Sequence, residues 1–166
     1  MTLERMWAGW RSGYIDTVAT KEPHPDDGCF LCELAVDDPD GNQVLVRGDG
    51  AYAVLNAYPY CSGHLMVVPN RHVPGMDDLS DAELHELTRM IRDATTAVRE
   101  AYACDGMNVG MNLGRAGGAG VPGHLHVHVV PRWSGDTNFM TAVAEVRVLP
   151  ESLDTSYERL RAVWPS

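Results

Sequence analysis

The feature that most constrains this chain is the stretch His124-Leu-His126-Val-His128-Val-Val, in which histidines and aliphatic residues alternate. A period of two is typical of a β-strand, because successive side chains of a strand point to opposite faces of its sheet. The three histidines therefore share one face and the aliphatic residues share the other. We expect a half-buried strand that presents three neighbouring imidazoles, roughly 7 Å apart.

This row of imidazoles fits more than one chemistry. The histidines could be incidental on a solvated strand face, or three neutral imidazoles could hold zinc with a fourth position open for water. Alternatively, a neutral imidazole could attack phosphorus, form a phosphoramidate and depart readily, because imidazole is a good leaving group. The residues alone leave the metal and the nucleophile open.

A glycine-rich segment, residues 114–123, comes directly before the histidines. Glycines let backbone N–H groups approach an anion closely, so this segment suits a phosphate, although a flexible connector is the alternative. The chain carries a formal net charge of -10, which disfavours nonspecific attraction to nucleic acid or anionic membranes. A polyanionic ligand therefore needs a local site of backbone N–H groups, imidazoles or a metal.

The rest of the chain predicts an α+β domain with an antiparallel sheet. A long helix begins at Ser80, because Ser80-Asp-Ala-Glu83 has the capping-box pattern and apolar residues follow on one face to Ala101. A short helix is expected within residues 1–28, and a length of 166 residues favours a single domain. Strands are expected at 43–47, 51–56, 64–68, 107–113 and 124–130, the third closed by Pro69 and the last by Pro131.

The hydropathy of the chain, its first residues and its cysteines bear on the cellular compartment. No apolar run approaches the roughly 20 residues that cross a bilayer, and the first residues lack the order of a signal peptide, so we expect a cytoplasmic protein. Thiols stay reduced in that compartment, which argues against a disulfide scaffold. The spacing Cys29-x-x-Cys32 suits two ligands of one zinc ion or a reduced thiol pair without metal.

The histidine strand resembles the motif of the histidine triad (HIT) family, in which histidines and hydrophobic residues alternate. The segment from Asn56 to His64, followed by Val67-Val68-Pro69, is similar to the upstream signature of that family. The resemblance spans roughly residues 29–139, between an N-terminal extension (1–28) and a C-terminal extension (140–166). It implies the HIT fold, with an antiparallel sheet, a long helix and a short N-terminal helix, and a homodimer or a higher homo-oligomer.

The resemblance also implies roles for individual residues. His126 would be the nucleophile, His128 would orient it and contact phosphate, and His64 would support the array. A structural zinc ion would be bound by Cys29, Cys32, His72 and His124. Nucleotide contacts would come from Phe30, Leu31, Leu55, Asn56, Asn112, Gly118, Ala119 and Gly120. Without the family, Phe30, Leu31 and Leu55 are simply core residues.

The stretches 53–60, 131–140 and 148–150 are most similar to the bacterial diadenosine tetraphosphate phosphorylase branch of the family. This implies cleavage of adenine dinucleoside polyphosphates, by phosphate or by water, through a nucleotidyl-histidine. The alternatives are a nucleoside phosphoramidate hydrolase and a nucleotide-binding regulatory protein with little turnover. Gly120 departs from the family, which often has Ser or Gln there, and only a backbone N–H remains to assist the leaving group.

Overall fold

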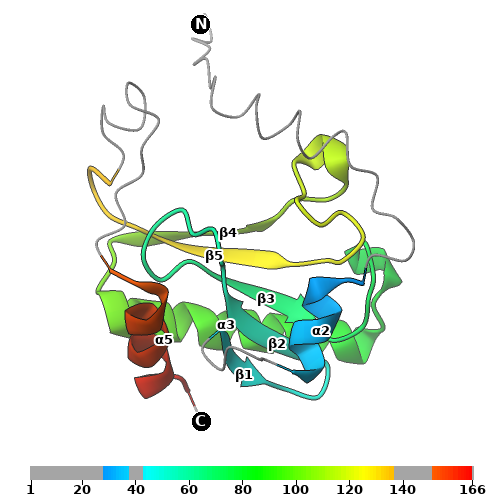
Figure 1. Cartoon of the computed structure of the whole chain (residues 1–166), viewed down its shortest axis with the longest axis horizontal. Coiled ribbons are helices and arrows are strands. Elements are labelled where there is room, and N and C mark those ends of the chain that lie inside the picture. Colours follow the sequence, from blue (N-terminus) through cyan, green and yellow to red (C-terminus); the bar gives the residue numbers. More distant parts are fainter. Residues whose placement is uncertain (1–27, 38–42, 137–150, 166) are drawn as a thin grey trace, which may run out of the picture.

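A computed structural model describes residues 28–37, 43–136 and 151–165. Its elements are α2 (Phe30–Val36), β1 (Val44–Arg47), β2 (Ala51–Leu55), β3 (Leu65–Pro69), the 3-10 turn η1 (Met76–Asp78), α3 (Asp81–Tyr102), β4 (Gly106–Met111), the 3-10 turn η2 (Arg115–Gly117), β5 (Val127–Arg132) and α5 (Leu153–Ala162). The strands form a single antiparallel sheet in the order β1-β2-β3-β5-β4 (Figure 1). The expected α+β class with a long helix is confirmed.

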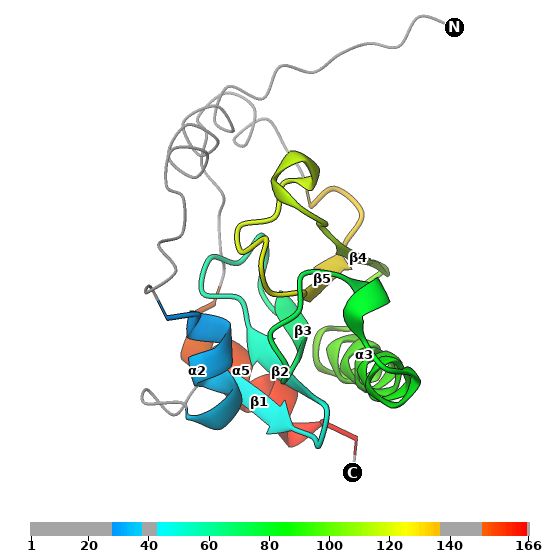
Figure 2. The same cartoon turned by 90° about the vertical axis from the view of Figure 1, so that its right-hand side faces the viewer.

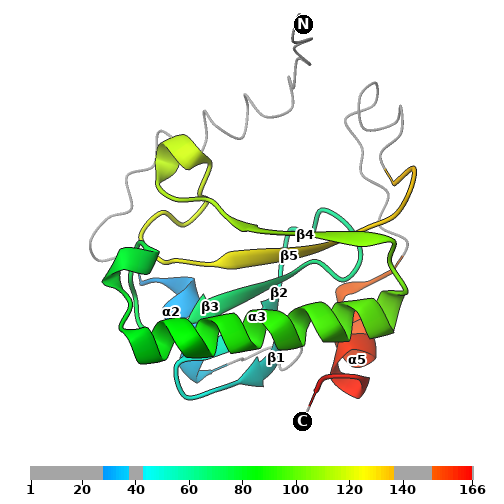
Figure 3. The ribbon, with the colours of Figure 1, turned by 180° about the vertical axis from the view of Figure 1, so that it is seen from behind.

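The sheet lies between helices (Figure 2). Helix α3 runs across one face, over β2, β3 and β5 (Figure 3), and α5 packs beside it and against β1. Helix α2 covers the other face, where Leu31 packs with Tyr52 and Met66. Both faces of β2 and β3 are therefore covered, and all residues of these two strands are buried.

Helix α3 begins where the sequence predicts. The Ser80 hydroxyl accepts a hydrogen bond from the Glu83 N–H (3.3 Å), and the Glu83 carboxylate accepts one from the Ser80 N–H (2.8 Å). This reciprocal pair satisfies two donors that a helix start leaves unpaired. The predicted apolar face is also confirmed, since Leu87, Ala94 and Val98 are buried against the sheet.

The predicted last strand is shifted along the chain. It pairs only from Val127, and it continues through Pro131 to Arg132. The Pro131 carbonyl oxygen accepts a hydrogen bond from the Cys61 thiol on the β2–β3 loop (3.2 Å), so the Pro131 nitrogen also faces that loop. On this side β3 no longer pairs with β5 beyond Val129, so no strand partner needs an N–H from residue 131, and proline is tolerated. The prediction that Pro131 ends the strand was therefore wrong.

Two helices were not predicted. Helix α2 has only seven residues and no side-chain cap at Cys29, and its end is instead stabilised by Arg47, whose guanidinium donates to the carbonyl oxygens of Leu34 (2.9 Å) and Ala35 (3.1 Å). Helix α5 has a Ser152 N-cap and buries Leu160 in the core. The short helix expected within residues 1–28 falls almost wholly outside the described residues. No helix in the described part of the chain is long and apolar enough to span a bilayer.

Substituting Leu87 with alanine tests the packing of α3. Leu87 is 1% exposed at the centre of the face that meets the sheet. We expect Leu87→Ala to lower the free energy of unfolding by about 2–5 kcal/mol, because it leaves a cavity in the core. His85→Ala, on the exposed side of the same helix, should change it by less than about 0.5 kcal/mol. Urea denaturation of both variants gives the comparison, and equal losses would contradict the packing described here.

Candidate active site and metal-binding cluster

Four histidines gather on the face of the sheet opposite α3. His128 lies on β5, His124 and His126 lie on the segment that leads into it, and His64 ends the β2–β3 loop. Leu125, Val127 and Val129 pack in the core under α3, as the alternation predicts. The ring of His128 lies 5.1 Å from that of His126 and 5.2 Å from that of His64, centroid to centroid.

The backbone fixes the proton of His126. Its Nδ1 lies 2.8 Å from the His124 carbonyl oxygen, in a buried contact. A carbonyl oxygen can only accept, so Nδ1 carries the hydrogen and the neutral ring keeps its lone pair on Nε2. This is the protonation form that a nucleophilic imidazole needs.

The other two histidines form a relay with a defined direction. The Tyr60 N–H donates to His64 Nδ1 (3.0 Å), so a neutral His64 carries its proton on Nε2. That Nε2 lies 3.0 Å from His128 Nδ1 and donates to it. His128 consequently carries its own proton on Nε2. Asn56 Nδ2 also lies 3.4 Å from His64 Nε2, but two N–H groups cannot bond to each other, so this longer contact is only a close approach.

Burial lowers the pKa of two of these histidines, His128 and His124. Desolvation, with a smaller contribution from His126, lowers the pKa of His128 to about 4. Desolvation likewise lowers the pKa of His124, despite the opposing hydrogen bond to Pro69. The neutral His128 therefore places an N–H donor beside His126, whose neutral ring keeps its lone pair on Nε2. A phosphorus atom could be attacked by His126 Nε2 while an oxygen on it is stabilised by the His128 N–H.

A second cluster lies at the other end of the row. Cys29, Cys32, His72 and His124 each direct one ligand atom into a common space, all within 4.8 Å of one another. Cys32 Sγ lies 3.3 Å from His72 Nδ1, and Cys29 Sγ lies 3.3 Å from His124 Nδ1. His124 Nε2 donates to the Pro69 carbonyl oxygen (2.9 Å), which leaves the Nδ1 lone pair facing the sulfurs. Two sulfurs and two imidazoles are a donor set that suits a tetrahedral zinc ion.

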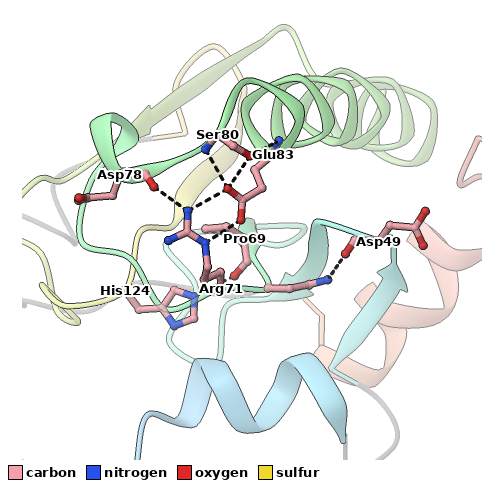
Figure 4. A network of polar contacts seen from close by, with 8 residues as sticks. Asp49, Pro69, Arg71, Asp78, Ser80, Glu83 and His124 are labelled. Atoms are coloured by element: carbon pink, nitrogen blue, oxygen red, sulfur yellow. Dashed lines mark hydrogen bonds and ion pairs between the residues drawn. The ribbon is translucent and has the colours of Figure 1, made fainter.

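Four consecutive residues, 69–72, connect this cluster to the rest of the fold, and Figure 4 shows the surroundings of Pro69 and Arg71. Pro69 accepts from His124, and Asn70 donates to the Gly48 and Asp49 carbonyl oxygens (both 3.0 Å). Arg71 donates to the Glu83 carboxylate (2.8 and 2.9 Å) and to the Asp78 carbonyl oxygen (2.6 Å), at the start of α3. His72 then joins the cluster. The capping carboxylate of α3 is thus also the anchor of the segment that bears His72.

Comparison with known proteins shows which family the chain belongs to. The HIT domain model matches residues 40–135. The chain belongs to the HIT family. It is 38% identical to "AP-4-A phosphorylase" of Mycobacterium tuberculosis, over 98% of this chain and 85% of the relative. It is 35% identical to "Bis(5'-nucleosyl)-tetraphosphatase [asymmetrical]" of Schizosaccharomyces pombe, over 59% of this chain and 53% of that protein.

The fold agrees with solved HIT structures. A zinc-bound histidine triad family protein from Mycobacterium smegmatis superposes with a TM-score of 0.66 at 26% identity, covering 82% of this chain and 92% of that one. A HIT-like protein from Bartonella henselae gives a TM-score of 0.64 at 22% identity, covering 80% and 91%. The HIT fold expected from the histidine motif is therefore confirmed.

The residues expected to contact a nucleotide are placed differently from one another. Leu31 and Leu55 are at most 2% exposed within the core, which is the alternative that the sequence left open for them. Phe30 is exposed at the start of α2, and Asn56 is half-buried beside His64. Asn112 donates to the Gly118 carbonyl oxygen (3.4 Å) and so ties the end of β4 to the glycine-rich loop.

Hydrogen bonds within the glycine-rich loop hold part of its backbone. Gly118 adopts a positive φ of 86° as it closes η2, Ala119 is buried and Gly120 is exposed. The Ala119 N–H is bonded to the Gly114 carbonyl oxygen (3.2 Å) and the Gly118 N–H to that of Arg115 (2.9 Å). Neither of these N–H groups therefore points freely at a ligand in this conformation.

Sequence reasoning missed the groups that set the protons. The carbonyl oxygens of Pro69 and His124 and the N–H of Tyr60 decide which nitrogen of each histidine is free. Backbone groups leave no mark in a sequence, because every residue except proline offers the same two. Tyr60 could have been noticed only as an aromatic residue four positions before His64.

Proposed function

We propose that this HIT protein is an enzyme that transfers a nucleotidyl group out of a dinucleoside polyphosphate through a covalent intermediate on His126. The single observation that supports it best is the hydrogen bond from His126 Nδ1 to the His124 carbonyl oxygen, which leaves Nε2 as a nucleophile. A solvated strand face would not bury this ring to 6% exposure or fix its proton. The neighbouring N–H of His128 supplies the donor that phosphoryl chemistry needs.

In the first step, the lone pair of His126 Nε2 attacks the α-phosphorus of the nucleotide. The bond from phosphorus to the bridging oxygen breaks, and its electron pair leaves with the remaining nucleotide. His128 Nε2–H donates to the reacting phosphate and stabilises the charge on its oxygens. In the second step, phosphate or water attacks the same phosphorus, and the nitrogen–phosphorus bond returns its electron pair to His126.

We propose diadenosine tetraphosphate as the substrate, because the Mycobacterium tuberculosis relative named for that compound matches nearly the whole chain. Phosphate as acceptor would give ATP and ADP, and water would give ATP and AMP. Asn56, beside the array, would bind the ribose, and Asn112 with residues 118–120 would shape the phosphate site. Phe30 would contact the base from α2. Leu31 and Leu55 would support this pocket from within the core.

The assay that tests the mechanism separates the products of diadenosine tetraphosphate with and without inorganic phosphate. We expect ATP plus ADP only when phosphate is present, and His126→Ala should lower turnover on the order of 10⁴-fold or more, because the nucleophile is lost. His85→Ala, on the exposed side of α3, is the matched control and should keep full activity.

Other outcomes select other functions. ATP plus AMP without phosphate would mean a hydrolase. Cleavage of adenosine phosphoramidate alone would mean a phosphoramidate hydrolase. If the wild type and His126→Ala both bind nucleotide and neither turns it over, the enzyme proposal is overturned.

We also propose that the Cys29, Cys32, His72 and His124 cluster holds a structural zinc ion, which would fill all four ligand positions and leave none for substrate. Support comes from the donor set and from the zinc-bound HIT relative. Zinc would join the start of α2 to the segment that fixes the His126 proton.

Zinc content of the purified protein checks this. We expect one zinc ion per chain, its loss in Cys32→Ser with a lowered melting temperature, and its retention in Cys104→Ala, because Cys104 lies outside the cluster. Burial and the neighbouring Cys29 raise the pKa of the metal-free Cys32 thiol to about 11, so zinc must displace protons and should be released as pH falls. Retention by Cys32→Ser would contradict the assignment.

A homodimer is proposed at β4, the last strand of the sheet. Its outer edge pairs with no strand in the described part of the chain, and Val109 is 45% exposed on it. An open edge of this kind is a template for a second copy. Sedimentation should give about twice the 18.2 kDa chain mass, and Val109→Asp should shift the protein toward monomer, whereas Val36→Asp on α2 should not. A monomeric wild type would reject the proposal.

A further inference from the structure

The β2–β3 loop, residues 56–63, carries two tyrosines in contrasting positions. The Tyr58 side chain is 87% exposed. The Tyr60 ring packs on the histidines: its centroid lies 4.6 Å from that of His64 at an angle of 37°, and 6.1 Å from that of His128 at 27°. Tyr60 therefore covers the outer side of the His64–His128 pair.

The loop is held in place by hydrogen bonds that do not involve this ring. Asn56 Oδ1 accepts from the Tyr58 N–H (2.9 Å), and the His64 N–H donates to the Cys61 carbonyl oxygen (3.2 Å). The Cys61 thiol in turn donates to the Pro131 carbonyl oxygen on β5. The backbone that presents the Tyr60 ring to the histidines is thus held by groups of Asn56, Cys61 and His64.

We propose that Tyr60 is a positioning residue for His128. Its N–H sets the proton on His64 Nε2, and its ring keeps water from the histidine pair, so that His128 meets the phosphate as a neutral Nε2–H donor. This inference rests on the proposed reaction for its purpose, but the protonation states it describes exist in the free protein.

Two effects of the ring on His128 oppose each other. Excluding water disfavours the charged imidazolium, whereas the face of an aromatic ring attracts a cation by about 0.5–1 kcal/mol at distances within about 6 Å. At 6.1 Å the attraction to His128 is weak, so water exclusion dominates, in agreement with the lowered pKa of His128. Removing the ring should therefore make His128 easier to protonate.

Tyr60 is one of several neighbours of His128. In the described part of the chain, the titratable groups that lie against it are His64, His126 and Tyr60. Its register partners, Met66 on β3 and Gly110 on β4, carry no charge. The ring is thus a separable part of the environment of His128, whereas either histidine would change the array itself.

Histidine NMR of the substrate-free protein tests the proposal. In the wild type, the ¹⁵N shifts should place the neutral His128 proton on Nε2. Tyr60→Ala keeps the backbone N–H, so this tautomer should persist while the pKa of His128 rises by about one unit. Tyr60→Phe and Tyr58→Ala should match the wild type. If Tyr60→Ala does not fold, Tyr60→Gln admits water at similar length and carries the same expectation.

Enzyme kinetics then connect the ring to function. In Tyr60→Ala, the apparent pKa on the acid side of the pH profile of kcat/KM should rise by the same amount as the pKa of His128 measured by NMR. KM at pH 7.5 should stay within about twofold of the wild type. A neutral His128 with its proton on Nδ1, or an unchanged pKa in Tyr60→Ala, would overturn the proposal. A KM effect shared by Tyr60→Phe would instead mean that Tyr60 touches substrate. Because the NMR result needs no turnover, an inactive protein would reject the proposed function and leave this test intact.

Discussion

Two hydrogen bonds of His124 govern the geometry of the site. Its ring donates from Nε2 to the last carbonyl oxygen of β3, which turns Nδ1 toward the cysteines at the start of α2. Its own carbonyl oxygen accepts a hydrogen bond from His126 Nδ1. A single residue therefore fixes the spacing between β3, α2 and the row of histidines. A shift of this residue would change both the contact with the cysteines and the hydrogen bond of His126.

The segment 69–72 shows how the fold maintains that arrangement. Successive residues reach the segment that leads into β5, the β1–β2 turn, the start of α3 and the cysteine cluster. None of these contacts is strong alone, since an exposed ion pair such as Arg71–Glu83 typically contributes at most about 1 kcal/mol. Together these contacts fix the orientation of the segment, because a backbone held at four consecutive residues has little freedom to rotate.

Periodic and local features of the sequence predicted the structure well. The alternation at 124–130 placed Val127 and Val129 in the core, and the capping box placed the start of α3, because both depend on residues close together in the chain. The sequence could not show where β5 begins to pair, nor that α2 would form, because its end is stabilised by Arg47 from a strand. The protonation of the histidines was equally hidden, since it depends on carbonyl oxygens that only folding brings near.

Gly63 connects the histidine site to α3, which lies on the other face of the sheet. Its positive φ of 77° turns the chain just before His64, and the ring of Tyr102, at the end of α3, occupies the space that a side chain at position 63 would need. The β2–β3 loop is thus backed by a ring of α3, the helix on the face of the sheet opposite the histidines. Natural variation at these two positions should be correlated, and selection for activity would then act on a part of the surface remote from the chemistry.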